Sequence, residues 1–443
     1  MPQTADLIIF NASELLTCRG PVEGVSGEGA LSDLEVVEGG AIAIAGGCIV
    51  AVGTTASVFQ DWDARERFDA LGKLVSPGFV DPHSHLLYAG SRHREYEGRV
   101  TGRPAAGIDG GIRYSVSRTR SASDTELVAQ AMADLDVMLA HGTTTLEAKT
   151  GYGLDAASEL RLLRLTAHLH HAIEVVPTFL ALHVPPAATE RSRDGFIDDM
   201  LAALPEAAKL AEYCDVTADP IGFTVAECLQ VGHRARALGM RIRVHADQTG
   251  DGGGAFVAAR LGAAGADHLD YTTDEGFRDM AAAGTVATLL PAVTYHMCEM
   301  TSNIENGCLR PPSKPFMPLL ARRAILAGGV VALSTDYNPG TAPTPSMQAV
   351  MQLAARLYRL NYAEIWHMCT LNAAVALDRG HDRGSLEVGK RADVVLWGVP
   401  SHGMVINRFG YNQVDSVWVG GKRVVTGGAP ATSIKQAKRS YCS

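Results

Sequence analysis

The chain has 443 residues, a length that favours one large domain with a smaller companion. Hydrophobic residues make up 47% and charged residues 20%, the composition of a protein with a large buried core, which excludes global disorder. The net charge of −9 comes without a concentrated basic run, so neither a nucleic acid nor a membrane surface is the expected partner. The expected ligand is a small molecule.

The apolar runs of the sequence are short. The longest, residues 41–52 and 324–334, fall below the roughly 20 apolar residues that span a bilayer. The N-terminus lacks the basic and apolar segments of a signal peptide, and the eight cysteines are scattered without a CxxC pair, as reduced thiols are. These features predict a cytoplasmic protein.

Two stretches rich in β-branched residues bracket the chain. Residues 6–10 and 40–53 combine Val and Ile with Gly pairs, and residues 392–397 and 416–426 repeat this character near the end. We expect strands and tight turns in all four segments.

Between these stretches, short apolar strands alternate with amphipathic helices rich in Ala, Leu and Arg. Eight strands with helical connections over roughly 300 residues match a (β/α)8 barrel of the α/β class, whose usual length is about 250 residues. An open doubly wound sheet is the alternative, but no GxGxxG motif opens a first helix. The predicted strands are 74–81, 143–149, 174–179, 213–217, 241–245, 266–269, 286–289 and 330–334. The predicted helices include 124–141, 156–172, 194–208, 225–238 and 254–261.

Polar residues gather where the predicted strands end, which is where barrel enzymes place their chemistry. His83 and His85 lie two residues apart on extended chain, so both side chains point to the same side. His245 ends the fifth strand, His268 ends the sixth, and Asp336 follows the eighth. Three imidazoles and a carboxylate are the donor set of a catalytic zinc or iron site rather than of structural zinc.

The segments that carry these residues resemble the amidohydrolase superfamily, metal-dependent hydrolases of cyclic amides and amidines. Within it, they are most similar to the branch that opens an imidazolone ring, and the resemblance covers nearly the whole chain. The segments are DPHSHLLYAGSR (81–92), AHGTTTLEAKTGYGL (140–154), TFLALH (178–183), HADQ (245–248), TDYNPGT (335–341) and GSLEVGKRAD (384–393).

The resemblance implies a role for each matching residue. One divalent metal ion, zinc or iron, would bind to His83, His85, His245 and Asp336. His268 would be the catalytic histidine beside the attacked carbon, and Asp336 would carry a proton from water to the nitrogen that leaves. The residues around the substrate would be Arg92, Tyr152, His183, Gln248, Asn338, Gly340 and Thr341.

Two of these assignments agree with elementary chemistry. Arg92 offers a planar fork that suits a carboxylate, so the substrate should carry one. Gln248 stands where many relatives have a glutamate, and a neutral amide can orient a substrate but cannot carry protons. Lys149 ends the second predicted strand, whereas relatives with two metals use a lysine from a later strand, so we expect it in a supporting role beside one metal.

The resemblance also implies an architecture and a reaction. A TIM barrel over residues 74–380 would be flanked by a small β-sandwich domain built from residues 1–73 and 381–443. A homodimer would hydrolyse 4-imidazolone-5-propanoate to N-formimidoyl-L-glutamate.

Two other functions stay open. One is a related amidohydrolase or aminohydrolase acting on another small heterocycle. The other is a non-catalytic metal-binding barrel, which is disfavoured because all four ligands and His268 are present together. Residues 103–112 and 291–312 differ from the pattern of the imidazolone branch, and both would lie over the barrel mouth, where loops set specificity.

Overall fold

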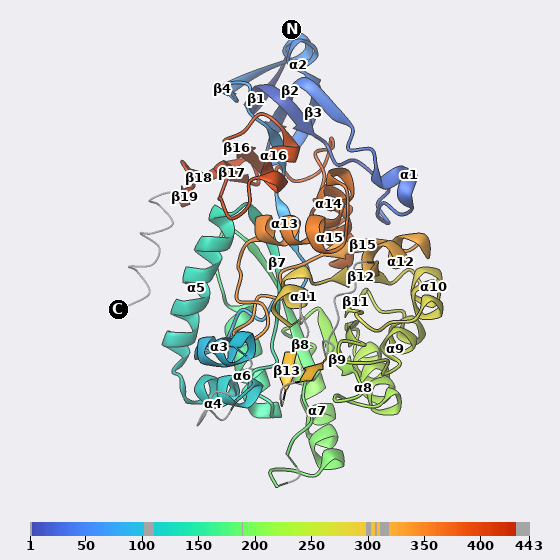
Figure 1. The fold of residues 1–443 in the computed structure, drawn as a ribbon. Coiled ribbons are helices and arrows are strands. Elements are labelled where there is room, and N and C mark those ends of the chain that lie inside the picture. Colours follow the sequence, from blue (N-terminus) through green and yellow to red (C-terminus); the bar gives the residue numbers. More distant parts are fainter. Residues whose placement is uncertain are drawn as a thin grey trace.

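The computed structural model describes residues 2–101, 110–187, 189–297 and 319–430, together with the backbone of residues 303–305 and 308–310. Two large sheets lie one above the other in this part of the chain (Figure 1). The lower sheet has eight strands and is surrounded by helices, and the upper one is a mixed nine-stranded sheet from both ends of the chain. The predicted fold class, an α/β barrel with a flanking β-structure, is confirmed.

The barrel strands pair in chain order, and every neighbouring pair is parallel. The last and first strands meet just beyond their ends, where Ser84 and Tyr337 form a parallel bridge. There the Asp336 N–H donates to the His83 carbonyl over 3.0 Å, so the barrel closes at its predicted functional end. The strands are β6 (Phe79–Asp81), β7 (Thr143–Lys149), β8 (Glu174–Leu182), β9 (Tyr213–Ala218), β10 (Arg241–Ala246), β11 (Gly265–His268), β12 (Val286–Leu289) and β15 (Val331–Leu333).

Most of the long helices between the strands begin at a polar residue whose side chain accepts a hydrogen bond from the first turn. Ser123 and Thr224 form complete capping boxes with Glu126 and Glu227. The predicted helix 156–172 ends earlier, at Ala167, because the His168 ring donates to a carbonyl of the last turn. The long barrel helices are α5 (Asp124–Ala140), α6 (Ala156–Ala167), α7 (Arg193–Ala207), α8 (Val225–Ala237), α9 (Gly254–Leu261), α10 (Asp274–Ala282), α13 (Met347–Leu357) and α14 (Tyr362–Cys369).

The flanking sheet joins the two ends of the chain, and its strands run in the order β19-β18-β17-β16-β5-β1-β2-β3, with β4 beside β1. In Figure 1 the blue strands of the N-terminal segment and the red strands of the C-terminal segment lie together above the barrel. The strands are β1 (Gln3–Leu16), β2 (Val36–Ala45), β3 (Cys48–Thr54), β4 (Trp62–Asp69), β5 (Val75–Pro77), β16 (Val394–Trp397), β17 (Val414–Val419), β18 (Lys422–Thr426) and β19 (Ala429–Pro430).

The predicted strand 74–81 is in fact two strands, β5 in the flanking sheet and β6 in the barrel. The chain passes from one sheet to the other at Gly78, whose N–H donates to the Asp393 carbonyl over 3.0 Å. A Cβ at Gly78 would lie 2.4 Å from the Thr144 side chain, so the crossing requires glycine. Both halves are apolar and buried, which is why they read as one strand in the sequence.

Large aromatic side chains pack together at the first residue of β6. Phe79 packs on Trp366 and Trp397 with ring centroids 5.6 and 5.5 Å apart, and the Trp397 indole donates to the Ser76 hydroxyl. The strand that leads to His83 therefore begins in a tightly packed aromatic core.

None of the helices in the described part of the chain has both the length and the apolar character that a membrane span needs.

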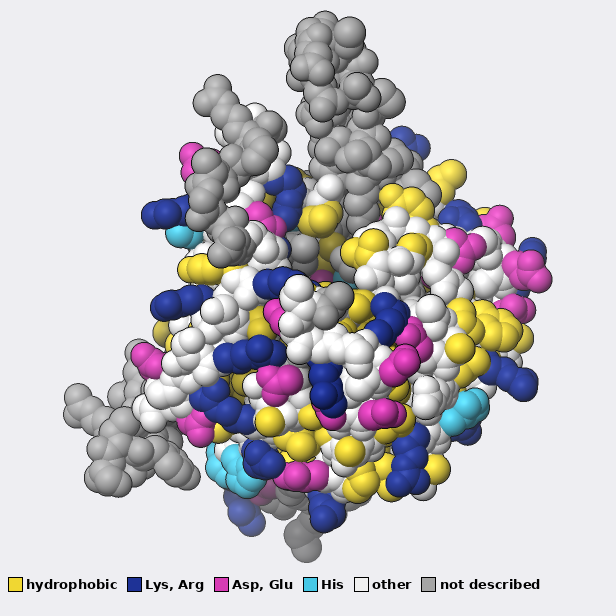
Figure 2. Space-filling view, turned by 90° about the horizontal axis from the view of Figure 1, so that it is seen from below, with side chains coloured by type: hydrophobic (Ala, Val, Ile, Leu, Met, Phe, Trp, Pro, Cys, Tyr) yellow, Lys and Arg dark blue, Asp and Glu magenta, His cyan; other side chains and the backbone are white. Residues whose placement is uncertain are grey.

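Figure 2 shows the molecule from below, with Lys, Arg, Asp and Glu side chains interspersed over that face. The two segments predicted to lie over the mouth, residues 103–112 and 291–312, lie largely outside the described residues. The structure describes residues 110–112 of the first segment. It describes residues 291–297 of the second, together with the backbone of 303–305 and 308–310. Residues 431–443 also lie outside them. The remaining elements are α1 (Glu28–Leu31), α2 (Thr55–Asp61), α3 (His93–Thr101), α4 (Ile112–Ser121), α11 (Pro291–Met297), α12 (Leu320–Leu326), α15 (Leu371–Ala376), α16 (His402–Asn407), β13 (Asn303–Glu305) and β14 (Cys308–Arg310).

Candidate active site

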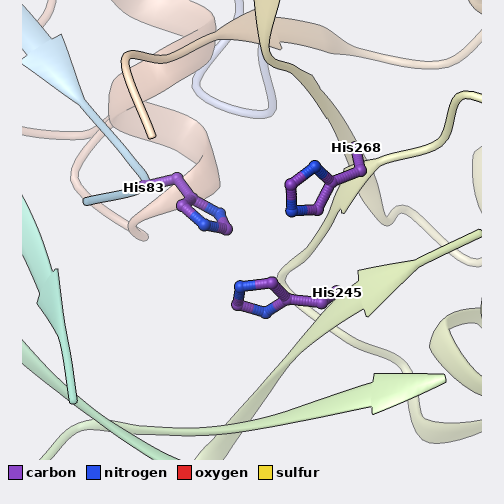
Figure 3. A group of neighbouring side chains, drawn as sticks. All are labelled: His83, His245 and His268. Carbon is purple, nitrogen blue, oxygen red and sulfur yellow. The ribbon is translucent and has the colours of Figure 1, made fainter. Parts of the chain in front are cut away.

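The predicted metal ligands and the predicted catalytic histidine converge beyond the ends of β6, β10, β11 and β15. Figure 3 shows the rings of His83, His245 and His268 turned toward one common space. Their nitrogen atoms lie within 4.8 Å of one another, and the ligand atoms of His83, His85 and Asp336 form a second such group. The five residues are between 0% and 3% exposed, so the group is a buried one.

Two of these residues have an unusual backbone. His268 has a φ of 75° and Asp336 a φ of 48°, in the left-handed region that non-glycine residues rarely adopt. Such a conformation costs on the order of 1–3 kcal/mol and persists where the surrounding structure demands it, frequently at functional sites.

Four histidines around this space are oriented by a hydrogen bond from the Nδ1 atom. His83 donates to Asp267 over 2.7 Å and His245 to Asp215 over 3.0 Å. Carboxylate oxygens can only accept here, so Nδ1 carries a hydrogen and Nε2 is the nitrogen that can offer a lone pair to a cation. His85 and His183 are oriented in the same way by the backbone carbonyls of residues 150 and 151, over 3.0 and 2.7 Å.

The cluster fits a divalent metal ion. The Nε2 atoms of His83 and His245 and the Oδ1 atom of Asp336 are buried without a hydrogen-bond partner among the described residues. Asp336 Oδ1 lies 3.3 Å from His83 Nε2 and 3.5 Å from His85 Nε2. Tetrahedral ligands at 2.0–2.2 Å from zinc are about 3.3–3.6 Å apart, so these spacings suit a shared ion. Neutral imidazoles held by a hydrogen bond at the far nitrogen are also the usual metal-binding form.

Burial sets the charge state of the outer two histidines. It lowers the pKa of His85 well below its usual value, and the neighbouring histidines lower it further. Burial also lowers the pKa of His183 to about 4. Burial opposes protonation of His83 as well, but Asp267 and Asp336 outweigh it and raise its pKa to about 9, so a cation binding there competes with a proton.

A closed cluster of charged side chains lies in the barrel strands next to the histidines. We call it the ionic floor, and its members are Glu147, Lys149, Asp215, Arg243 and Asp267. All five side chains are 0% exposed. Burial raises the pKa of Asp215, but His245 and Lys149 outweigh it, and the pKa stays well below its usual value. Burial likewise raises the pKa of Asp267, but Arg243 and Lys149 outweigh it. Both aspartates are therefore ionised acceptors for the histidine rings.

The predicted substrate residues Tyr152 and His183 line the same space as His85. The His85 ring stacks on His183 with centroids 5.3 Å apart and meets the Tyr152 ring edge-on at 5.5 Å. Tyr152 is buried, and burial raises its pKa, so the phenol stays protonated and can donate a hydrogen bond to a ligand. Gln248 is half-buried and follows the end of β10.

The predicted carboxylate anchor, Arg92, has a partner within the chain. Its Nε and Nη2 atoms donate to the two oxygens of Glu95 over 2.8 and 2.6 Å. Glu95 also accepts from Arg99 and from the Gly111 N–H, which joins α3 to the start of α4. The edge of the guanidinium that faces Glu95 is therefore already in use, and Nη1 is the nitrogen outside that pair.

The loop after β15 brings Gly340 against Arg92. A Cβ at Gly340 would lie 1.8 Å from Arg92 Nη1, so only glycine leaves room for the guanidinium. The Asn338 amide is bonded within the loop: it donates to the Asp336 carbonyl and Thr341 hydroxyl and accepts from the N–H groups of Gly340 and Thr341. Asn338 thus shapes the loop that carries Asp336, Gly340 and Thr341.

Sequence reasoning missed Glu147, Asp215 and Arg243 in the ionic floor, and Glu95 at the mouth. A signal for each exists in hindsight. Glu147, Asp215 and Arg243 are charged residues inside barrel strands, and Arg243 stands two positions before His245, so both face the same side. Glu95 lies three residues after Arg92 at the start of a helix, a spacing that pairs opposite charges.

Residues 74–424 match the amidohydrolase family. The chain therefore belongs to the amidohydrolase family. It is 38% identical to an imidazolonepropionase of Thermoanaerobacter pseudethanolicus, over 96% of this chain and 99% of that protein. It is 37% identical to an imidazolonepropionase of Bacillus velezensis, over 96% of this chain and 98% of that protein. The predicted membership of this family, in its imidazolonepropionase-like branch of hydrolases, is confirmed.

Solved structures show the same fold at low sequence identity. An adenosine deaminase from Xanthomonas campestris with bound zinc has a TM-score of 0.70 and 20% identity, covering 100% of this chain and 98% of its own. A 5-methylcytosine deaminase from Klebsiella pneumoniae has a TM-score of 0.68 and 17% identity, covering 95% of this chain and 97% of its own. At these identities the likeness concerns the architecture alone.

Proposed function

We propose that this chain hydrolyses 4-imidazolone-5-propanoate to N-formimidoyl-L-glutamate, using one divalent ion, zinc or iron. The ion would be held by His83, His85, His245 and Asp336. The observation that carries the proposal is the convergence of these ligand atoms, with His83 Nε2 and Asp336 Oδ1 3.3 Å apart and unpartnered among the described residues. Identity of 37–38% to imidazolonepropionases over nearly the full chain supports the substrate.

An ion held by these four residues would supply Lewis-acid chemistry, a lowered pKa of water and a polarised ring carbonyl. Asp336 takes a proton from the attacking water and passes it to the ring nitrogen that leaves, while the water oxygen joins the carbonyl carbon. The His268 ring centroid lies 5.6 Å from that of His83 and 5.3 Å from that of His245. From there His268 holds the water and stabilises negative charge on the carbonyl oxygen.

The remaining residues of the mouth bind and orient the substrate. Arg92 contacts the propionate carboxylate through the part of its guanidinium outside the Glu95 pair, and Tyr152 donates from its protonated phenol. His183 and Gln248 orient the ring, and Gly340 and Thr341 line the loop opposite Arg92. Asn338 acts through the shape of that loop.

Turnover by the purified protein tests the proposal. We expect loss of the imidazolone absorbance with one equivalent of N-formimidoyl-L-glutamate formed and no ammonia. A panel of hydantoins, cyclic ureas and amino-heterocycles serves as the control. Ammonia release, or a higher kcat/KM on any panel member, would assign the chain to a different reaction of the same family.

Three further features stay proposals. The first is a homodimer, which light scattering after size-exclusion chromatography would detect. The second is the division into residues 74–380 and a β-sandwich domain from residues 1–73 and 381–443, which limited proteolysis would test. The third is a cytoplasmic location; it is supported by the five described cysteines, which are free thiols.

A further inference from the structure

Lys149 lies at the centre of the ionic floor. Its Nζ atom is 2.6 Å from Asp215 Oδ2, 3.0 Å from Glu147 Oε1 and 3.2 Å from Asp267 Oδ2. These carboxylates come from β7, β9 and β11, so one ammonium group joins three strands of the barrel. The side chain is 0% exposed, and no water competes for these contacts at its surface.

Two of the three carboxylates continue directly to metal ligands. Asp215 accepts from Nδ1 of His245 over 3.0 Å, and Asp267 accepts from Nδ1 of His83 over 2.7 Å. Lys149 is therefore one carboxylate away from two of the four proposed ligands. Among the described residues, no carboxylate of the ionic floor links Lys149 to the other two proposed ligands, His85 and Asp336.

The second cation of the floor does not duplicate this role. Arg243 contacts Asp267 over 2.7 Å and Glu147 over 3.2 Å, and its other hydrogen bonds go to backbone carbonyls. Within the described residues, Lys149 is the one lysine or arginine that forms an ion pair with Asp215. Without it, Asp215 would be a buried carboxylate that accepts only from the ring and the backbone N–H of His245 among the described residues, and a buried charge that has lost its ion-pair partner costs several kcal/mol.

We propose that Lys149 is a positioning residue of the metal centre, whose ammonium holds Asp215 and Asp267 in place so that His245 and His83 present Nε2 to the ion. The inference rests on the proposed metal site. It gives Lys149 a different task from a bridging ligand, since a carbamate at this nitrogen would add a fourth negative charge among three carboxylates. Outer partners of metal-bound histidines commonly change metal affinity by about 10–100-fold.

The test compares zinc affinity in Lys149→Met and the parent protein by competition with a chromophoric chelator. We expect the dissociation constant to rise about 10–100-fold in the variant. The Co²⁺-loaded variant should also show an altered visible spectrum, which reports ligand geometry and is insensitive to general loss of stability.

Lys390 provides a matched control, because it is also a buried lysine. Its Nζ atom donates to the Gly380 carbonyl and the Ser385 hydroxyl over 2.7 and 2.6 Å, in the segment that returns to the flanking sheet. Lys390→Met should lower the melting temperature while zinc affinity stays within about twofold of the parent, well short of the change expected from an outer partner of the ligands.

The outcomes separate the inference from the function it rests on. If the parent binds one zinc ion and Lys149→Met binds it equally well with an unchanged Co²⁺ spectrum, Lys149 is not a positioning residue and the metal site stands. If the parent binds no zinc, the proposed function itself fails. Should Lys149→Met not fold, Asp215→Asn breaks the same link while keeping the shape of the side chain. It should weaken zinc binding similarly, and unchanged binding would overturn the inference.

Discussion

Charged side chains lie on both sides of the histidine cluster, and the two sides are built differently. On the inner side, the ionic floor is fully buried and links several barrel strands. On the outer side, the Arg92 and Glu95 side chains are 10% and 23% exposed; Arg92 directly precedes α3 and Glu95 lies in the first turn of that helix, which has no buried residue. The floor therefore cannot change without disturbing the barrel, whereas the mouth can.

The same contrast runs through the histidines. His83 and His245 donate to carboxylates of the floor, while His85 and His183 donate to backbone carbonyls near the mouth. A carboxylate acceptor raises the basicity of the ring as well as orienting it, and a carbonyl mainly orients it. The comparison teaches that the inner side fixes two of the proposed metal ligands through ionised carboxylates, whereas the outer side holds its histidines through the backbone alone.

The largest expected effect comes from removing a ligand that rests on the floor. His245→Ala should lose most of the bound metal and lower kcat/KM by at least about 10³-fold, since Lewis-acid chemistry supplies several kcal/mol. Elemental analysis of the isolated protein should fall from about one equivalent of metal per chain. A fully active, metal-free preparation would contradict the proposed centre.

The second effect separates chemistry from metal binding. His268→Asn should keep the metal and the fold while kcat falls by roughly 10²–10⁴-fold, the range for losing an acid–base or oxyanion group. The measurement pairs metal content with steady-state kinetics on the same sample. Activity within a few-fold of the parent would show that His268 is a bystander.

The third effect belongs to the mouth. Arg92→Met removes the guanidinium and should raise KM for a carboxylate-bearing substrate by about 10–100-fold, the weight of a charged hydrogen bond, with kcat little changed. An analogue with the carboxylate replaced by an amide should respond far less. Arg99→Met is the matched control, because Arg99 also pairs with Glu95 but is not a proposed substrate contact.

A coupling near zero in this cycle of two proteins and two ligands would rule out Arg92 as the anchor. The pocket would then suit a neutral ring. The proposed carboxylate-bearing substrate would be wrong, while the proposed metal centre would stand.

The smallest effect tests how tightly the mouth is packed. Gly340→Ala should push the guanidinium of Arg92 aside, because the new Cβ would lie 1.8 Å from Nη1. We expect KM to rise about 2–10-fold, the weight of one weakened hydrogen bond. Gly29→Ala is the control, since a Cβ there meets nothing within 4 Å. Equal kinetics for both variants would show that Arg92 moves without consequence.

The convergence of His83, His85, His245 and Asp336 could be predicted from the sequence because their positions follow from local rules. An HxH pair on extended chain faces one side, and strand ends of a barrel meet at one mouth. The partners of Lys149 could not be predicted, because Asp215 and Asp267 lie on other strands and only the three-dimensional register brings them within 3.2 Å. The division of residues 74–81 depended likewise on Thr144, a residue distant in sequence.

The mouth was predictable only in part. Arg92 was expected to bind a carboxylate of the substrate, and its pairing with Glu95 and its contact with Gly340 were not predicted. Asn338 was expected to contact the substrate, and its amide is bonded within its own loop. A side chain's residue type shows what it can bind, and its neighbours decide whether that capacity is already used.

The position of β5 has a consequence for synthesis of the chain. β5 lies between β1 and β16 and leads directly into β6, the strand that His83 and His85 follow. While a ribosome makes the segment from Pro77 to Val394, roughly 15–60 s at 5–20 residues per second, one edge of β5 has no partner strand. The edge of β5 therefore stays unpaired until β16 has been made. During this time the nascent chain is most exposed to wrong strand pairing and to chaperone binding.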